Sequence, residues 1–119
     1  MDVIENLSQA FHGFMYVCNR YYRIEFMNKH LIERIGHDAT GELCYKALQG
    51  LDKICPWCPG EKVFRGEIVG LEIKSPKDNR RYYIINAPYY YHFDTVSMIS
   101  MFIDITEKKL LKESLKDEL

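Results

Sequence analysis

The sequence predicts an α+β fold in which one five-stranded antiparallel sheet is covered on one face by short helices. Two extended segments precede residue 29 and three follow residue 68, and tight turns join most of them. Helical spacing of apolar residues is confined to the middle of the chain and to its ends. At 119 residues, of which 47% are hydrophobic and 28% charged, the chain is expected to form one domain with a single core.

The first half of the chain predicts a terminal helix, a hairpin and three short helices. Residues 1–12 have apolar side chains at helical spacing, which predicts an amphipathic helix before Gly13. Residues 14–18 form the apolar run of a buried strand, and residues 24–28 alternate between apolar and polar, so the two segments predict a hairpin. The helices that cover the sheet are predicted at residues 29–35, 40–48 and 59–64.

The second half predicts three strands. Residues 69–74 alternate, residues 81–87 form a strand whose far end is disturbed by Pro88, and residues 96–105 form a long last strand. We therefore expect the sheet and its covering helices to occupy residues 13–105.

A charged exit helix is predicted at residues 106–119. Asp104 is placed to cap it, and Glu107 follows three residues later in capping-box spacing. A single leucine stripe is too narrow for a core helix and needs a partner surface, so we expect a homodimer through the terminal helices. The alternatives are a helix packed back on its own sheet, or one frayed because a downstream domain is missing. The stripe consists of Leu111, Leu115 and Leu119.

These segments, in this order, resemble the PAS domain family over roughly the whole chain. Residues 24–28 look like the family's second strand with its characteristic asparagine. The most specific piece, Asp104-Ile105-Thr106-Glu107-Lys108-Lys109, resembles the Asp-Ile-Thr-Glu-Arg-Lys signature where a signalling helix leaves many bacterial PAS domains. The chain departs from the family at Tyr21-Tyr22, where an Asp-Gly turn is usual, and in a cysteine loop, which is similar to that of a subset of bacterial sensor PAS domains.

The resemblance implies a sensory module of a bacterial signalling protein rather than an enzyme. Such domains usually lie upstream of a histidine kinase or a diguanylate cyclase, and they sense a ligand or a redox state. The change then passes to the effector domain through the dimeric exit helix. The resemblance assigns the relay to Asp104, Ile105, Thr106 and Glu107.

The resemblance also implies a ligand pocket between the sheet and the middle helices. The alternative is that the same side chains fill the core and leave no cavity, because small domains pack with few voids. The sequence names no ligand. The candidate lining residues are Tyr16, Phe26, Tyr45, Leu48, Phe64, Tyr83, Ile85 and Met101.

Three cysteines at Cys44-x10-Cys55-x2-Cys58 are the sharpest chemical feature of the sequence. A Cys-x2-Cys loop brings two thiolates to one tetrahedral metal, and a third cysteine nearby adds another corner. A structural zinc site needs a fourth ligand, for which His37 is the nearest candidate. Behind it come His30, Cys18 and an acidic side chain.

Two other interpretations of the cysteines stay open beside the metal. In the first, Cys58 caps a helix that begins at Pro59, and the helix dipole lowers the pKa of its thiol for a disulfide or thiol switch. In the second, the cysteines only pack, and Trp57 plugs the core. Cys18, in an apolar strand, is predicted to be core. The rival to a sensory domain is thus a stand-alone metal- or thiol-redox protein that uses Cys44, Cys55 and Cys58.

Composition argues against several other classes. A net charge of −1 disfavours nucleic-acid binding. No apolar run approaches the roughly 20 residues that span a bilayer, and the thiol-bearing chain is expected in the cytoplasm. Covalent haem is disfavoured because Cys58 is followed by proline rather than histidine, and the flavin-reactive Asn-Cys-Arg-Phe motif is missing. No nucleophile–base pattern, paired catalytic carboxylates or phosphate-binding glycine loop predicts catalysis.

Overall fold

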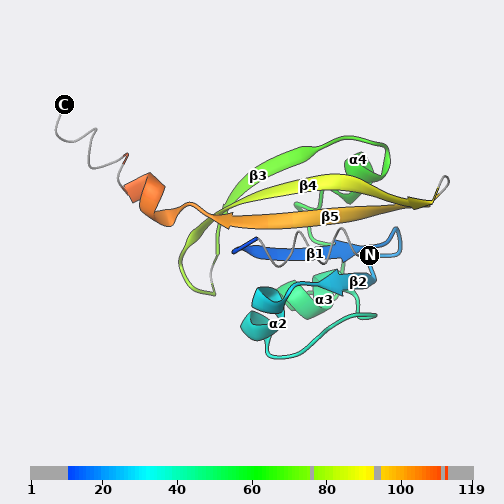
Figure 1. Ribbon diagram of the computed structural model, residues 1–119, viewed down its shortest axis with the longest axis horizontal. Coiled ribbons are helices and arrows are strands. Elements are labelled where there is room, and N and C mark those ends of the chain that lie inside the picture. Colours follow the sequence, from blue (N-terminus) through cyan, green and yellow to red (C-terminus); the bar gives the residue numbers. More distant parts are fainter. Residues whose placement is uncertain (1–10, 76, 93–94, 111, 113–119) are drawn as a thin grey trace.

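One antiparallel sheet of five strands forms the centre of the fold (Figure 1). The strand order is β2-β1-β5-β4-β3, so the first and last strands of the chain are neighbours. The predicted α+β fold is confirmed. The computed structural model describes residues 11–75, 77–92, 95–110 and 112. The strands are β1 (Phe14–Cys18), β2 (Ile24–Met27), β3 (Val69–Lys74), β4 (Arg81–His92) and β5 (Thr95–Asp104).

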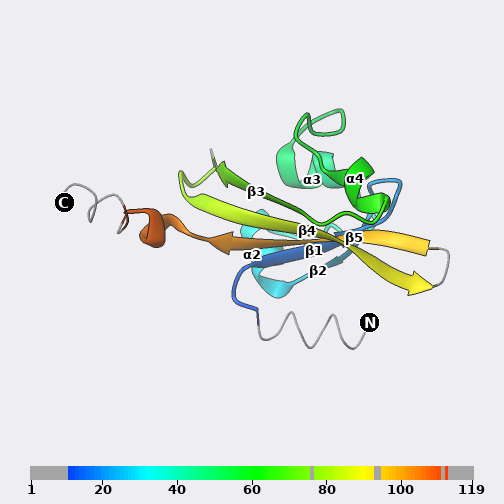
Figure 2. The same ribbon diagram turned by 90° about the horizontal axis from the view of Figure 1, so that it is seen from above.

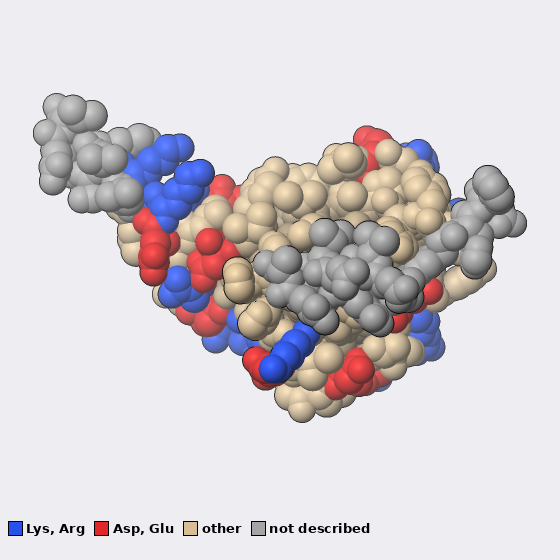
Figure 3. All heavy atoms as spheres, in the orientation of Figure 1, with Lys and Arg blue, Asp and Glu red and all other residues tan. Residues whose placement is uncertain are grey.

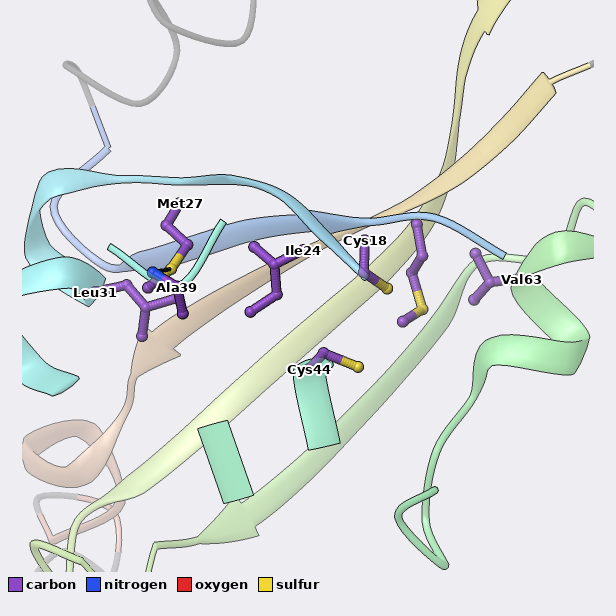
Figure 4. Close-up of a cluster of buried hydrophobic side chains, with 8 residues drawn as sticks. Cys18, Ile24, Met27, Leu31, Ala39, Cys44 and Val63 are labelled. Atoms are coloured by element: carbon purple, nitrogen blue, oxygen red, sulfur yellow. Dashed lines mark hydrogen bonds between the residues drawn. The ribbon is translucent and has the colours of Figure 1, made fainter. Parts of the chain in front are cut away.

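Three short helices lie between β2 and β3 in the chain, and α3 and α4 cover the same side of the sheet (Figure 2). Each is shorter than a helix that is stable alone, so tertiary packing must hold it. Their buried side chains Leu31, Cys44 and Val63 join one apolar cluster with strand residues (Figure 4). The helices are α2 (Lys29–Ile35), α3 (Cys44–Gln49) and α4 (Gly60–Phe64).

Alternation along β1 sends successive side chains to opposite faces of the sheet. Cys18 faces the helices and belongs to the cluster that includes Ile24 and Met98. Met15 and Val17 are fully buried in a second cluster on the other face. The core therefore has a part on each face of the sheet. The partly buried side chains around the second cluster are Phe11, Phe26, Tyr89, Ile99 and Met101.

Asn28 fixes where β2 stops and α2 starts. Its Oδ1 accepts hydrogen bonds from the backbone N–H of Leu31 and of Met15, both at 3.1 Å. Its Nδ2 donates to the carbonyl of Gly13 at 2.9 Å. The side chain is buried, so one residue caps the helix and ties it to the strand next to β2.

The second helix starts later than the sequence predicts. The sequence predicts a helix over residues 40–48, but α3 begins at Cys44. The residues before it run alongside β2: the Ile24 N–H donates to the Glu42 carbonyl at 2.9 Å, and Leu43 forms a bridge with Arg23. Backbone pairing with the edge of the sheet therefore outweighs the helical spacing of this stretch.

Strand β4 continues through Pro88 to His92, five residues further than predicted. Pairing with β3 ends at Asn86, whereas Pro88 pairs with Met98 of β5. A proline removes one donor, and it is tolerated where the strand has only one neighbour. The strand therefore does not end there.

Both predicted terminal helices lie largely outside the described residues. Residues 1–10, 111 and 113–119 are not among the described residues, so the two terminal helices, and the division into three segments, stay predictions. Residues 106–110 are helical. Across the ranges that the structure describes, none of the helices has the length and apolar character needed to cross a membrane.

Candidate functional site

A small cavity lies between the sheet and the loop that carries the cysteines. We call it the cysteine cavity, since Cys44, Cys55 and Cys58 all line it. Its volume is about 40 Å³, which is room for a water molecule or a very small ligand. The sheet side of its wall includes Ile84 and Phe102. The three cysteines that the sequence singles out are therefore brought to one place.

A larger cavity of about 410 Å³ adjoins the first. We call it the arginine cavity, because the guanidinium of Arg34 lies in its wall. Tyr16, Leu48 and Phe102 line both cavities. Of the two expectations for the space under the helices, a pocket or a filled core, the structure thus contains a pocket in two parts.

Half of the predicted pocket residues lie elsewhere. Tyr16, Tyr45 and Leu48 line a cavity, and Phe64 packs beside the same core without lining either one. The others lie on the opposite face of the sheet, which corrects the expectation that they line the pocket. They are Phe26, Tyr83, Ile85 and Met101.

The correction has a physical cause in β4. Residues 82–85 are apolar or aromatic at every position, so the sequence has no polar–apolar alternation to set the phase of the strand. The structure turns Tyr82, Ile84 and Asn86 toward the helices and leaves Tyr83 41% exposed. The sequence does not predict the buried Asn86 in the cavity wall, since a lone asparagine inside a strand carries no pocket signal.

Cys18 is a core residue, as the sequence predicts, because it is fully buried in the apolar cluster. It projects from β1 into the cluster that also holds Cys44 of α3 (Figure 4). Interaction with the neighbouring Cys44 thiol, followed by burial, raises the pKa of Cys18, and interaction with Cys18 lowers the pKa of Cys44. Cys44 is therefore the thiol of the pair that ionises first. All four cysteines are free thiols.

The other two cysteines are not activated. Burial raises the pKa of Cys55 to about 11 and also raises the pKa of Cys58. The expectation that Cys58 caps a helix is wrong, because α4 begins at Gly60 and Pro59 is its N-cap residue. Trp57 is 50% exposed and does not plug the core.

The structure does not assemble the predicted zinc ligands. His37 lies 3.0 Å from the carboxylate of Glu42, and both side chains are about half exposed. Among the residues that are described, no group of three or more His, Cys, Asp or Glu side chains is arranged to hold a metal ion. Zinc at Cys44, Cys55 and Cys58 stays a prediction.

The end of β5 is fastened to the start of β4. The carboxylate of Asp104 accepts from the guanidinium of Arg80 and, at 3.0 Å, from the N–H of Thr106. The Thr106 hydroxyl accepts from the N–H of Arg81 at 2.8 Å, and the Ile105 N–H donates to the Arg81 carbonyl at 2.9 Å. Charged side chains of both signs gather at this junction (Figure 3). Three of the predicted relay residues thus belong to one network.

The first turn of the exit helix also contacts the sheet. Lys109 forms an ion pair with Glu72 of β3 at 3.1 Å. Glu107, the fourth predicted relay residue, is exposed in the same turn. The described start of the helix is therefore anchored at two strands, β3 and β4.

Comparison with solved structures identifies this architecture. The chain is similar to the PAS domain of BvgS from Bordetella pertussis, with 17% identity and a TM-score of 0.62 over 99% of this chain and 97% of that one. The chain has the PAS fold. A domain of an HTR-like protein from Haloarcula marismortui is also similar, with 18% identity and a TM-score of 0.60 over 79% of this chain and 98% of that one.

A PAS domain of an HTR-like protein from Haloarcula marismortui matches this PAS fold too, with 11% identity and a TM-score of 0.53 over 87% of this chain and 93% of that chain. No protein-family model and no curated protein matches the sequence. At these identities the likeness is one of fold. Membership of the cysteine-loop subset stays a prediction.

Proposed function

We propose that this PAS domain is the sensory part of a bacterial signalling protein of the histidine kinase or diguanylate cyclase type. It detects a small ligand or a redox change in the two cavities and relays it through the exit helix, without catalysis of its own. One observation carries the proposal: Phe102 lines both cavities, and Asp104, two residues further along β5, is bound into the junction with the helix. A strand is a stiff element, so a displaced wall displaces the junction.

The relay is tested in a chimera in which the chain is joined, in helical register, to the dimeric core of a histidine kinase. Leu48→Trp puts a larger side chain into the wall that both cavities share and imitates a bound ligand, so we expect it to change the rate of autophosphorylation. Tyr83→Trp on the exposed opposite face is the matched control and should leave the rate unchanged. If Leu48→Trp and Tyr83→Trp give the same rate as the parent chimera, the sensory proposal fails.

The proposed dimer is tested separately by sedimentation equilibrium. We expect the chain to associate in a concentration-dependent way through the leucine stripe of residues 111–119. Replacing Leu115 with Lys should yield a monomer with an unchanged circular dichroism spectrum in the strand region. A wild-type chain that stays monomeric at the highest concentration measured would remove the dimer from the proposal.

A second candidate is a stand-alone thiol-redox protein, favoured by the packing of Cys18 and Cys44 in one buried cluster. Hydrogen peroxide would take two electrons from the two thiols, giving one disulfide and two water molecules. We expect peptide mapping by mass spectrometry to find this bond after peroxide treatment, and Cys55→Ser should retain it. A bond between Cys55 and Cys58 instead would contradict this candidate. Oxidation that changes chimera activity would place the same chemistry within a sensor.

A further inference from the structure

We propose that the arginine cavity binds a small organic carboxylate, whose apolar body packs under α2 and α3 and whose carboxylate takes the place of Asp78 on Arg34. This inference rests on the proposed function and names the chemical class of the signal. It concerns the larger cavity and not the cysteines.

The walls of the cavity suit an apolar body. Phe14, Leu31, Ile35 and Leu48 line it, and its volume of about 410 Å³ falls within the ordinary range for small-molecule sites. Apolar walls with a few convergent polar groups are typical of such sites. The cysteine cavity, at about 40 Å³, is too small for the same ligand.

The charged groups in the wall all have one sign. They are Arg34, Lys46 and Lys77, and no aspartate or glutamate occurs among the described residues that line the cavity. The Arg34 side chain is only 20% exposed, and its guanidinium carbon lies 4.7 Å from the ring centre of Phe14 and 5.5 Å from that of Tyr82. A cation held against two aromatic rings at an apolar cavity favours an anion with an apolar body.

Arg34 already holds a carboxylate that belongs to the chain. Its Nη1 donates to Oδ2 of Asp78 at 2.7 Å, and its Nη2 donates to the Ser75 hydroxyl at 3.2 Å. The Tyr82 hydroxyl donates to the same Asp78 oxygen at 2.6 Å. A planar guanidinium and a hydroxyl are therefore oriented for one carboxylate. Asp78 stands on a turn between β3 and β4, and a ligand carboxylate with its own apolar contacts competes with it directly.

Displacement of Asp78 is transmitted to the exit helix through a hydrogen bond and an ion pair that the structure contains. Oδ1 of Asp78 accepts from the N–H of Arg80 at 3.0 Å, and Arg80 pairs with Asp104 at the junction. A ligand that releases Asp78 thus loosens the turn that presents Arg80 to Asp104. Arg34 is therefore the reason to expect a carboxylate as the ligand. The turn that carries Asp78 and Arg80 is the route by which binding acts on the exit helix.

The experiment titrates the purified chain by isothermal calorimetry with 3-phenylpropionate, indole-3-acetate and hexanoate, each beside its neutral amide. We expect at least one acid to bind about tenfold or more tightly than its amide, because a charged hydrogen-bond partner is lost in the amide. Arg34→Gln should abolish this preference. Arg65→Gln, which removes an exposed arginine paired with Glu67 at 3.7 Å, is the matched control and should leave it intact.

A second variant separates loss of the site from loss of folding. Asp78→Asn removes the internal competitor, so it should tighten binding of the same acid, which misfolding cannot do. The proposal is overturned if no acid binds more tightly than its amide, or if Asp78→Asn weakens or leaves unchanged the affinity.

The two proposals fail in different ways. If Leu48→Trp alters kinase activity in the chimera but no acid shows the preference, the carboxylate site is wrong and the sensory function stands. If an acid binds as expected but neither the acid nor Leu48→Trp alters kinase activity, the site is right and the sensory function is wrong.

Discussion

Arg80 and Asp104 form an ion pair that joins the residue before β4 to the last residue of β5. Both side chains are partly exposed, and such pairs usually contribute little to global stability. The pair nevertheless stands where the helix departs, and Asp104 also accepts from the Thr106 N–H. Its consequence therefore concerns the orientation of the helix more than the free energy of unfolding.

Breaking this pair should uncouple the helix from the sheet. We expect Arg80→Gln to shift the melting temperature little, while it removes the effect of Leu48→Trp on autophosphorylation in the kinase chimera. Differential scanning fluorimetry and the phosphorylation assay measure the two quantities on the same protein. Arg20→Gln, which replaces an exposed arginine outside the junction, serves as the control. If Leu48→Trp still changes the rate of autophosphorylation in a chimera that also carries Arg80→Gln, the relay does not pass through this ion pair.

Replacing Asn28 should be costly for folding. Asn28→Ala removes the cap of α2 and leaves the N–H of Met15 and the carbonyl of Gly13 without their side-chain partner. We expect a loss of about 2–4 kcal/mol, read as a lower urea midpoint at constant slope. Asn28→Asp keeps both accepting bonds and loses only the donor, so it should fall between wild type and Asn28→Ala. A loss equal for both variants would mean that the cap contributes nothing.

Acid should weaken the contacts of the β3–β4 turn. Although burial acts in the opposite direction, hydrogen bonds from Tyr82 and Arg34 hold the pKa of Asp78 below its ordinary value. A lowered pKa contributes stability that is present above the unfolded value of about 3.9 and is lost as the pH falls through the lower folded value. Urea midpoints of wild type and Asp78→Asn should therefore differ at pH 6 and converge toward pH 2. A constant difference across this range would contradict the assignment.

At high pH the same turn should weaken through Tyr82. Burial, followed by the hydrogen bond to Asp78, raises the pKa of Tyr82 to about 12. The contribution is complete below the unfolded value of about 10 and is lost as the pH rises through about 12. Tyr82→Phe should lack this loss, measured as urea midpoints at pH 8 and pH 11. Tyr83→Phe, on the opposite face, is the control and should behave as wild type.

Alkylation rates should separate the cysteines. With the pKa of Cys55 raised to about 11, its thiolate fraction at pH 8 is about one hundredth of that of an ordinary thiol. We expect its reaction with iodoacetamide, followed by peptide mapping, to quicken about tenfold for each pH unit between 8 and 10. In urea the same cysteine should react at the ordinary rate already at pH 8. Fast reaction of folded Cys55 at pH 8 would contradict the raised pKa.

How far the sequence predicts the structure depends on the kind of signal at each residue. The succession of strands and short helices along the chain follows from periodicity. The junction at Asp104 follows from capping chemistry. Periodicity fails at residues 82–85, where apolar side chains occur on both faces, so the sequence predicts Tyr83 and Ile85 in the pocket wall where the structure has Tyr82 and Ile84. Partners far apart in sequence carry no local signal at all.

The arginine cavity illustrates that last point. Arg34 and Asp78 are 44 residues apart, and neither belongs to a recognisable motif. Cys18 and Cys44 likewise meet only because β1 and α3 face one cluster. The cysteine spacing predicts that Cys44, Cys55 and Cys58 gather, and all three line the cysteine cavity, whereas no local pattern around Cys18 indicates that it packs in one cluster with Cys44.

The extension of β4 past Pro88 has a consequence for association between molecules. Beyond Asn86, β4 pairs with β5 alone among the strands that the structure describes. The outer edge of a sheet is a place where another chain can add a strand. Tyr90, 61% exposed on this stretch, would add an apolar contact to such a stack. Proline has no N–H to offer an incoming strand. We therefore expect Pro88, which the sequence predicts to disturb the end of β4, to disfavour the addition of a further strand there.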